Sequence, residues 1–444
     1  MRVAIVGSGY VGCVTGVSLA AHGHRVVLID SSADVVHALQ GGRAPFHEPG
    51  LDDALADLTA NGTLTVTSDL PAAIRASEMA FICVGTPSST DGSIDLTQVL
   101  AAAAQVLEAP DDGQRRTLVL KSTVVPGTTA DQIGPLVHAA PGRWSLAVNP
   151  EFLREGQAVD DGTAPDRIVI GACDADAERS LAALYEPFGA PLISVPPHTA
   201  ELIKYTSNAL LATLISFSNE IANIAEGLPG VAVEDVFHAI HLDRRLQGPD
   251  GHPASIVSYL AAGCGFGGSC LPKDIAALTR LAEARDVEPN LLRAVTQMNT
   301  SRADRMIGAT ESRLGGLSGR QVAVLGLAFK PDTDDVRASP AIPIVDGLVR
   351  RGATVRIFDP AAGEQAHRLW PDEPALSLAG SAEDALRDAD AALLVTSWPA
   401  FRHIPSDRFT ALMRTPIVID GRGMLDLAVR GEVQYWAIGH GPGA

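Results

Sequence analysis

The chain has 444 residues, a formal net charge of −18 at pH 7, 46% hydrophobic residues and 19% charged residues. This composition is typical of a well-packed globular protein with two or three domains, because a single core stops growing beyond about 250–300 residues. The negative charge disfavours nucleic acid and anionic membrane as partners, since both bind broad basic surfaces. The sequence contains no apolar run of about 18 residues, so no membrane span is predicted.

The cysteines and the N-terminus bear on the compartment. The five cysteines are odd in number and form no C-x-x-C pair, so the sequence signals neither a disulfide framework nor a zinc site, and no metal is expected. Residues 1–9 read directly as a strand and a turn, without the apolar core and cleavage site of a signal peptide. The cytoplasm is therefore the expected location.

Lysine is rare in this chain. Of the 34 basic residues, only four are lysines: Lys121, Lys204, Lys273 and Lys330. A lysine ammonium is compact and titratable, whereas a guanidinium is planar and always charged. Unless their distribution is due to chance, the four lysines mark positions where a compact ammonium is useful.

The first elements are a strand, a glycine-rich turn and a helix. Residues 3–6 form an apolar run, residues 7–12 read G-x-G-x-x-G, and a helical pattern extends to residue 21. A second apolar run, Arg25–Ile29, ends at Asp30. A strand before the motif, a helix after it and an acid about 20 residues on are the features of a dinucleotide-binding unit.

Each part of this unit has an expected role. Gly7 would make the turn, Gly9 would let a pyrophosphate approach the backbone, and Gly12 would let helix and strand pack closely. The carboxylate of Asp30 would accept hydrogen bonds from ribose hydroxyls and repel a 2′-phosphate, which favours NAD over NADP. The residues expected to bind NAD here are Gly7, Gly9, Tyr10, Val11, Gly12 and Asp30.

Three further apolar runs, at residues 79–84, 117–121 and 145–148, are each predicted to be a strand that ends in a polar loop. Ligands of a parallel open sheet lie at the carboxyl ends of its strands. The polar side chains expected along this crevice are Thr86, Thr123, Glu151 and Glu155.

These four residues also have ordinary structural interpretations. A helical turn after residue 150 would place the carboxylates of Glu151 and Glu155 on one face. Alternatively, Glu155 is a solvated residue and Glu151 is an acid at a helix N-terminus. For Thr123 the alternative is a loop cap.

The middle segment, residues 198–226, has helical apolar spacing and is predicted to be one long helix, a natural spine and dimerisation surface. A second, polar stripe on it includes Lys204 and Asn208, which project together because they are four residues apart. Together they are suitable donors for a developing oxyanion. A polar helix face in water is an equally good interpretation of the pattern. Residues 247–255, rich in glycine and proline, predict an exposed loop.

A cysteine lies in the segment FGGSCLPKD, residues 266–274. Pro272 suits the first turn of a helix, so Cys270 is expected at or just before a helix N-terminus. The partial positive charge of that terminus and the nearby Lys273 would stabilise a thiolate and make Cys270 a nucleophile. The alternative is that Cys270 is a buried, small apolar residue.

The last part of the chain repeats the character of the first. Gln321–Leu325 predict a strand that leads into Gly326, and Thr354–Phe358 predict a second strand that ends at Asp359. Only one of the three motif glycines remains, so this unit should bind a different nucleotide or none. Further strands are predicted at residues 391–396 and Ile417–Asp420. The elements predict an α/β protein with two Rossmann-like, doubly wound parallel-sheet domains joined by a long central helix. The expected domains are residues 1–196, 197–300 and 301–444.

The sequence resembles the UDP-glucose/GDP-mannose dehydrogenase family along nearly its whole length. The motifs that carry the resemblance are GSGYVG, EPGL, VGTP, STVVPGT, NPEFLREG, ELIKYTSN, SFSNEIANIAE, FGGSCLPKD, GLAFKPDTDDVRASP and DGR. The resemblance is strongest to members that act on UDP-glucose. It implies oxidation of the C6 alcohol of the sugar to a carboxylate with two NAD, through a thiohemiacetal and a thioester on Cys270. It also implies a homodimer or a higher homo-oligomer.

The resemblance implies a role for each matching residue. Lys204 and Asn208 would stabilise oxyanions. Asp274 would accept a proton or orient water, and Thr123 and Glu151 would hold or activate that water. The further residues implied at the NAD site are Thr86, Thr123, Glu155, Lys273 and Arg337. Those implied at the nucleotide-sugar site are Glu151, Phe152, Leu153, Arg154, Glu155, Lys204, Asn208, Arg245, Tyr259, Leu260, Ala261, Ala262, Gly263, Gly267, Lys330 and Arg422.

Several points remain open. Arg245 would reach the substrate of a neighbouring subunit. The family usually has a basic residue where this chain has Val35, which puts one adenosine contact in doubt. The alternatives are the same chemistry on GDP-mannose or a UDP-N-acetylhexosamine, a single-step hydroxyacid dehydrogenase, and a catalytically silent nucleotide-sugar sensor. A single-step dehydrogenase would not need Cys270. A sensor would not need the catalytic residues, which are Thr123, Glu151, Lys204, Asn208, Cys270 and Asp274.

Overall fold

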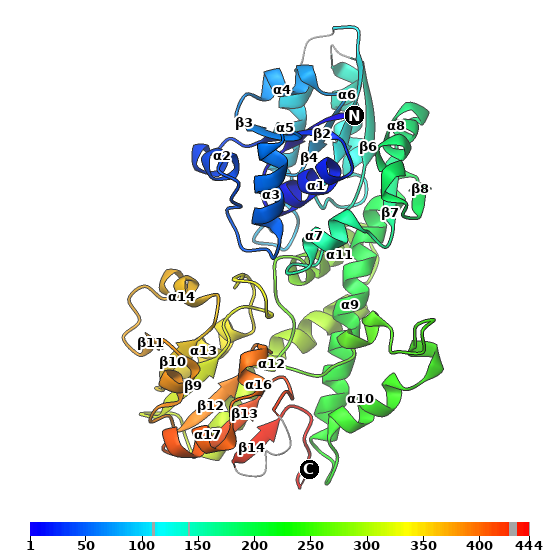
Figure 1. Cartoon of the computed structure of the whole chain (residues 1–444). Coiled ribbons are helices and arrows are strands. Elements are labelled where there is room, and N and C mark those ends of the chain that lie inside the picture. The colour runs from blue at the N-terminus through cyan, green and yellow to red at the C-terminus, as the bar shows by residue number, and fades with distance from the viewer. Residues whose placement is uncertain (109–111, 141–142, 426–432, 444) are drawn as a thin grey trace. The chain divides into compact units, whose positions relative to one another are not determined.

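The computed structural model describes residues 1–108, 112–140, 143–425 and 433–443 (Figure 1). The chain divides into two compact units, Met1–Ser207 and Asn208–Ala444. A helix of 29 residues, α9 (Pro197–Ala225), begins in the first unit and continues in the second. The fold is α/β, with two mainly parallel sheets and a long central helix, as the sequence predicts.

Within the described residues, the first unit contains an eight-stranded sheet of order β3-β2-β1-β4-β5-β6-β7-β8. Its strands are β1 (Arg2–Val6), β2 (Arg25–Ile29), β3 (Leu64–Thr67), β4 (Met79–Ile82), β5 (Arg115–Leu120), β6 (Arg143–Val148), β7 (Ile168–Ala172) and β8 (Leu192–Val195). Neighbouring strands run parallel except β6 and β7, which pair antiparallel through two residue pairs. The sheet is mainly parallel, and an antiparallel pairing toward the edge is a common feature of large sheets.

Helices cover both faces of this sheet, and successive side chains of β1 point alternately to the two faces. Val3 and Ile5 point into one core, which also contains side chains of α1, α3, α7 and α8. Ala4 and Val6 point into the other core, with side chains of α4 and α5. Because both faces are buried, the strands read as continuous apolar runs. The helices and helical turns of this unit are α1 (Tyr10–Ala21), α2 (Ala33–Gln40), α3 (Leu51–Ala60), α4 (Leu70–Ala76), α5 (Thr97–Leu107), η1 (Thr128–Ile133), α6 (Gly134–Ala139), α7 (Ala158–Thr163), α8 (Ala175–Tyr185) and η2 (Glu186–Phe188).

The second unit contains a sheet of order β11-β10-β9-β12-β13-β14, parallel throughout its described strands. These strands are β9 (Gln321–Leu325), β10 (Thr354–Phe358), β11 (Leu376–Leu378), β12 (Ala391–Leu394), β13 (Ile417–Asp420) and β14 (Gln434–Ala437). Its helices and helical turns are α10 (Val233–His241), η3 (Arg244–Leu246), η4 (Ser255–Tyr259), α11 (Leu271–Glu283), α12 (Asn290–Leu314), α13 (Ala341–Arg350), α14 (Gly363–Leu369), α15 (Ala382–Leu386), α16 (Pro399–Arg402) and α17 (Ser406–Leu412).

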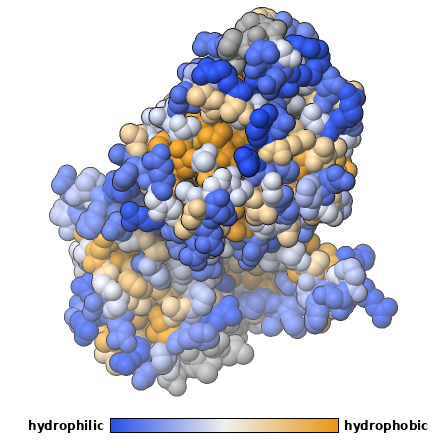
Figure 2. Space-filling model, turned by 45° about the horizontal axis from the view of Figure 1, so that its top comes forward, coloured by the Kyte–Doolittle hydropathy of each residue, from blue (hydrophilic) through white to orange (hydrophobic). Residues whose placement is uncertain are grey.

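Two features of the surface complete the description. Most of the face in Figure 2 is hydrophilic, and apolar side chains gather in limited areas. In the part of the chain that the structure describes, no helix combines the length and the apolar character that crossing a membrane requires. The glycine- and proline-rich loop predicted at residues 247–255 is present, largely exposed and closed by a bridge between Gln247 and Pro253.

Candidate active site

The turn after β1 has the geometry that the glycine motif predicts. Gly7 has a φ of +93°, a conformation that favours glycine, and its N–H donates to the carbonyl of Ile29 at 2.9 Å. A Cβ atom on Gly12 would lie 1.9 Å from the Gly7 oxygen, so α1 could not approach the turn with any larger residue. A Cβ atom on Gly9 would meet no atom within 4 Å.

The N-terminus of α1 is open to an anion. Gly9 is its N-cap, no side chain caps it, and no acid lies in its first turn. Such a terminus presents N–H groups and a partial positive charge to a phosphate. The carboxylate of Asp30, beyond β2, accepts hydrogen bonds from the N–H groups of Ser8 and Ser32, both at 2.9 Å. One oxygen serves each donor, so each keeps a lone pair for a ribose hydroxyl. These residues therefore fit a dinucleotide.

A buried glutamate ties this turn to the loop after β6. Glu48 is 5% exposed, and its carboxylate accepts hydrogen bonds from the hydroxyl of Tyr10 at 2.6 Å and from the N–H groups of Gly156 and Ala158 at 2.7 Å. Burial and this bond to Glu48 raise the pKa of Tyr10. The predicted NAD-binding Tyr10 thus points its hydroxyl at Glu48. The sequence signalled the EPGL motif but not these partners.

The loop after β6 holds an ion pair within the first unit. The carboxylate of Glu151 and the ammonium of Lys204 lie 2.8 Å apart, with side chains 7% and 6% exposed. Burial raises the pKa of Glu151, but Lys204, the N–H of Leu153 and then Lys121 more than offset this, so the pKa lies below its ordinary value. Glu151 is therefore ionised at neutral pH. The ring of Phe152 lies under Lys204, at 5.7 Å from its nitrogen.

Two structural expectations about these residues are wrong. Residues 151–154 form no helical turn, because the Glu151 carboxylate bonds the N–H of Leu153 and replaces the helical pattern. The interpretation of a polar helix face in water fails for Lys204 and Asn208, which are 4% and 8% exposed. Arg154 is exposed and turns to Asp161.

The other predicted residues of the first unit lie on loops at the ends of strands. Thr86 follows β4 and Thr123 follows β5, and both are partly exposed. Glu155 is partly exposed in the turn after Glu151. Val11, in the first turn of α1, is partly buried and packs against the core.

A second buried lysine, which the sequence analysis left without a role, lies under the same loop. The ammonium of Lys121 donates to the Oδ1 atom of Asn149 at 2.8 Å, and the hydroxyl of Tyr185 donates to the same atom. Asn149 also donates to the carbonyl of Val169 at 2.7 Å. Burial lowers the pKa of Lys121 to about 8, although Glu151 acts in the opposite direction. The rarity of lysine was the available signal for this residue.

The second unit holds the cysteine segment. Cys270 is the N-cap of α11 and is partly exposed, so the interpretation as a buried apolar residue is wrong. The hydroxyl of Ser269 lies 3.4 Å from its sulfur. Cys264, by contrast, is buried, and its thiol donates to the carbonyl of Val395.

An acid on the first turn of α11 is held from two sides. Asp274 is 1% exposed, and its two carboxylate oxygens accept separate hydrogen bonds. One comes from the amide of Asn208 on α9 at 2.6 Å and the other from the ammonium of Lys273 at 2.7 Å. The predicted trio of Asn208, Lys273 and Asp274 is therefore one hydrogen-bonded group.

The turn after β9 differs from the turn after β1. The Oδ2 atom of Asp359 accepts hydrogen bonds from the N–H groups of Leu327 and Ala328, at 2.7 and 3.0 Å, and from Trp398 at 3.1 Å. The contact with Leu327 repeats the contact between Ser8 and Asp30 in the first turn, whereas the contacts of the carboxylate with Ala328 and Trp398 are additional. A Cβ atom on Gly326 would lie 2.4 Å from Thr396. The loss of the dinucleotide motif seen in the sequence therefore has a structural counterpart.

The remaining predicted residues of the second unit fall into exposed and packed positions. Arg245 and Arg337 are 88% and 64% exposed in their side chains and each pairs with a nearby aspartate. Arg422 donates to the carbonyls of Val395 at 2.7 Å and Gly265 at 3.2 Å. Tyr259 ends η4, and Lys330 follows β9 and is partly exposed. The others in this segment are Leu260, Gly263 and Gly267, which are buried, Ala262, which is partly buried, and Ala261, which is exposed.

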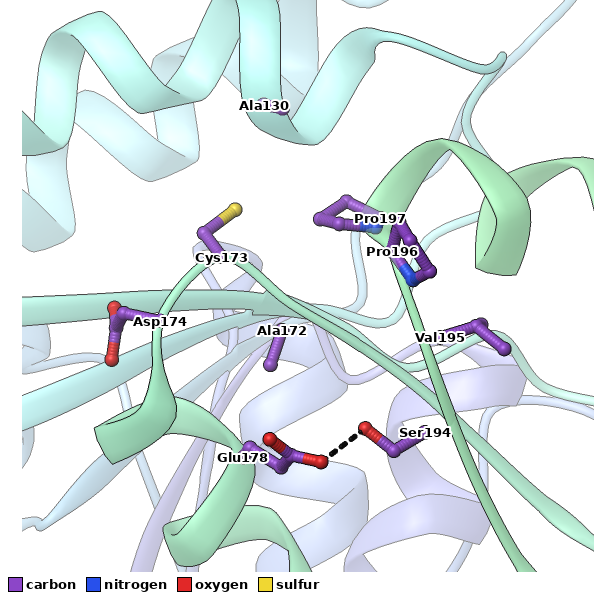
Figure 3. A pocket seen from close by; sticks show the side chains of 9 residues that line it. All are labelled: Ala130, Ala172, Cys173, Asp174, Glu178, Ser194, Val195, Pro196 and Pro197. Atoms are coloured by element: carbon purple, nitrogen blue, oxygen red, sulfur yellow. Dashed lines mark hydrogen bonds between the residues drawn. The ribbon is translucent and has the colours of Figure 1, made fainter.

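A cavity of about 520 Å³ lies in the first unit, away from the predicted residues (Figure 3). It is lined by Ala130, Ala172, Cys173, Asp174, Glu178, Ser194, Val195, Pro196 and Pro197. Partial burial and then the charge of Asp174 raise the pKa of Cys173 to about 11, so this thiol is a poor nucleophile at neutral pH. In the described part of the chain, no group of three or more His, Cys, Asp or Glu is arranged to hold a metal ion.

The fold and the first turn define a class, the NAD-binding dehydrogenases built on Rossmann-like units. The UDP-glucose/GDP-mannose dehydrogenase family models match at residues 1–189 for the NAD binding domain, 198–301 for the central domain and 323–427 for the UDP binding domain. The chain belongs to the UDP-glucose/GDP-mannose dehydrogenase family.

Individual relatives match along nearly the whole chain. UDP-glucose 6-dehydrogenase AglM of Haloferax volcanii is 42% identical over 95% of this chain and 96% of its own. UDP-glucose 6-dehydrogenase YwqF of Bacillus subtilis is 38% identical over 99% and 98%. The solved UDP-glucose dehydrogenase of Pyrobaculum islandicum is 39% identical, with a TM-score of 0.90 over 98% of this chain and 96% of that one.

Proposed function

We propose that the protein oxidises the C6 alcohol of UDP-glucose to the carboxylate of UDP-glucuronate, with two NAD per substrate. The observation that carries the substrate is the match of 95–99% of the chain to relatives named UDP-glucose 6-dehydrogenase. NAD, when bound, accepts one hydride from C6 in each of two oxidations. The residues proposed to hold it are the glycine turn with Tyr10 and Val11, Asp30, Thr86, Thr123, Glu155, Lys273 and Arg337.

Cys270 is proposed to keep the intermediate on the enzyme. Its sulfur adds to the aldehyde carbon left by the first oxidation, and the thiol proton is transferred to the former carbonyl oxygen, which becomes the hydroxyl of the thiohemiacetal. Loss of the second hydride and of the hydroxyl proton gives a thioester. Water then attacks the carbonyl, the carbon–sulfur bond breaks, and the acid and the free thiol are released. The position of Cys270 at the N-terminus of α11 supports this role, because the helix dipole favours a thiolate there.

The polar groups of each unit have proposed roles around this chemistry. Lys204 and Asn208 lie one turn apart on α9 and would donate to the oxyanions. An amide nitrogen carries two N–H groups, and Asp274 uses one of those of Asn208. Asp274 would accept a proton or orient water, and Glu151, ionised beside Lys204, would orient the hydrolytic water with Thr123. The residues proposed to bind the nucleotide sugar remain Glu151–Glu155, Lys204, Asn208, Arg245, Tyr259–Gly263, Gly267, Lys330 and Arg422.

UDP-N-acetylmannosamine is a second candidate substrate, because one solved relative supports it. The UDP-D-ManNAc dehydrogenase of Pyrococcus horikoshii is 28% identical, with a TM-score of 0.86 over 99% of both chains. The test is NADH formation with UDP-glucose, UDP-N-acetylmannosamine and GDP-mannose at matched concentrations. A kcat/KM highest for UDP-glucose supports the proposal, and a higher value for either of the others refutes the substrate.

We also propose a homodimer, or a multiple of it, formed through α9, and a cytoplasmic location. Leu210, Phe217 and Ile224 recur every seven residues on α9 in the second unit, with 49%, 48% and 57% of each side chain exposed. Apolar residues in such a stripe support pairing with a second helix. Phe217→Ser is expected to shift the mass measured by light scattering to that of one chain, and an unchanged mass contradicts this interface. Within the described residues, none of the five cysteines forms a disulfide, which supports a reducing compartment.

A further inference from the structure

The loop that precedes Cys270 is held at almost every residue. We define the cysteine loop as residues 263–269. The N–H of Gly263 donates to Asn219 on α9 at 2.8 Å, and the N–H of Cys264 donates to the carbonyl of Gly421 at 2.9 Å. Further on, the N–H of Gly268 donates to the carbonyl of Arg337 at 2.8 Å. Backbone groups that a loop usually gives to water are therefore bound by protein.

Helix α12 contributes three further hydrogen bonds through two polar side chains. Asn299 accepts a hydrogen bond from the N–H of Phe266 at 2.8 Å and donates to the carbonyl of the same residue at 3.0 Å. One turn later, the Nε atom of Arg302 donates to the carbonyl of Gly263 at 3.0 Å. Asn299 thus fixes both polar groups of one loop residue, as a neighbouring strand would.

The glycines of the loop make this fit specific. Gly265 has a φ of +104°, and a Cβ atom there would lie 2.7 Å from the Oδ1 atom of Asn299. A Cβ atom on Gly267 would lie 2.4 Å from the carbonyl oxygen of Ala338. The loop therefore passes against its neighbours without room for a side chain. It has one well-defined path, and α12 helps to define it.

Burial of the Arg302 guanidinium costs folding free energy. It is fully buried, and within the described residues no carboxylate bonds to it, while Glu226 is bonded to Arg305. Its Nη1 atom donates to Asn223 at 2.6 Å, and its Nη2 atom has no partner among the described residues. Burying an ionised side chain without a carboxylate partner costs free energy, which the hydrogen bonds to Gly263 and Asn223 offset. The benefit of Arg302 must then lie in what it holds.

We infer that Asn299 and Arg302 are positioning residues that hold the cysteine loop and so set the reactivity of the Cys270 thiol. Cys270 follows the loop directly and caps α11, where the N–H of Asp274 donates to the Cys270 carbonyl at 2.9 Å. A loop that shifts would move the sulfur off the helix axis, where the dipole acts within the first turn. The inference rests on the proposed function only in taking Cys270 as the nucleophile.

The test needs no substrate, so its result is separate from that of the proposed function. Full-length wild type, Asn299→Ala and Arg302→Met are treated with iodoacetamide, and the rate of modification of each cysteine is read by peptide mass spectrometry. Cys173, exposed in the first unit, is the internal reference. Buried Cys13 and Cys83 report unfolding of the first unit, and buried Cys264 reports unfolding of the second. Thr300→Ala is the matched control, because Thr300 is exposed on α12 and bonds only carbonyls of its own helix.

Loss of either hydrogen-bonding side chain is expected to slow modification of Cys270 by about tenfold, the effect of one hydrogen bond. Cys173 should keep its rate, Cys13 and Cys83 should stay protected, and Thr300→Ala should match wild type. An unchanged or faster rate at Cys270 in both variants overturns the inference. If a variant exposes Cys13 or Cys264, the milder Asn299→Asp and Arg302→Lys are compared instead, and wild-type rates at Cys270 in both overturn it equally. Slow modification in a protein that does not oxidise UDP-glucose supports the inference and refutes only the proposed function.

Discussion

Lys121 makes stability depend on pH in an unusual direction. Burial lowers its pKa from 10.5 to about 8 in the folded protein. Below about pH 8 both folded and unfolded chains carry the proton, and the full cost of burying the charge is present. Between about pH 8 and 10.5 the unfolded chain binds more protons than the folded chain, so the free energy of unfolding contributed by this residue rises with pH.

The magnitude follows from the two pKa values. Their difference corresponds to about 3 kcal/mol, since one pKa unit is about 1.36 kcal/mol. Between about pH 7 and about pH 9.5, the contribution of Lys121 to the free energy of unfolding rises by about 2 kcal/mol. Cys13 and Cys83 act in the opposite direction, because burial raises their pKa values to about 12 and they keep protons that the unfolded chain loses. The effect of Lys121 must therefore be measured as a difference between two proteins.

The assay compares wild type with Lys121→Met by urea unfolding at several pH values in this range. The free energy of unfolding of wild type minus that of Lys121→Met should rise by about 2 kcal/mol toward about pH 9.5. Tyr185→Phe is the control, because it removes the other hydrogen bond to the same Asn149 oxygen, and burial raises the pKa of the Tyr185 phenol so that it stays protonated in the folded protein across this range. If the difference between wild type and Lys121→Met stays constant or falls with pH, the conclusion that burial lowers the pKa of Lys121 is refuted.

Three further predictions concern single residues. Glu48→Gln should lower the free energy of unfolding by about 2 kcal/mol, because the NH2 group of the glutamine would face a buried donor and leave it without an acceptor. The same change should raise the KM for NAD. Unchanged stability in urea unfolding would contradict this. Gly12→Ala should abolish NAD binding in a fluorescence titration, because its Cβ would collide with the Gly7 oxygen, whereas Gly9→Ala should fold normally. If Gly12→Ala binds NAD with the wild-type affinity, the close contact between residue 12 and the Gly7 oxygen is not required for binding. Cys173→Ser should keep the wild-type kcat, because Cys173 lies away from the predicted site and its raised pKa keeps it mainly protonated at neutral pH. A loss of activity comparable to that of Cys270→Ser would show that Cys173 takes part.

The elements were predictable because their signals are local. The runs at Arg25–Ile29, Gln321–Leu325 and Thr354–Phe358 became strands with the predicted bounds, since the buried positions of each strand are all apolar. The long helix was predicted to begin one residue late and to end one residue late. The helical turn after residue 150 failed because the carboxylate of Glu151 competes for the backbone, which spacing cannot show.

The supporting groups were not predictable, because their partners are distant in sequence. Glu48 bonds Gly156, which is 108 residues away, and Tyr185 bonds Asn149, which is 36 residues away. Asn299 bonds Phe266 across 33 residues. No periodicity relates such pairs, and only the packing of elements brings them together. By contrast, Asp274 and Lys273 were accessible from sequence because they lie in the same helical turn as the cysteine.

The central claim is a four-electron oxidation through Cys270, and the most direct measurement is the yield of NADH from a limiting amount of UDP-glucose. Wild type should form two moles of NADH per mole of UDP-glucose, and Cys270→Ser should lose turnover. One mole of NADH from wild type, or an unchanged yield and rate in Cys270→Ser, would contradict the account.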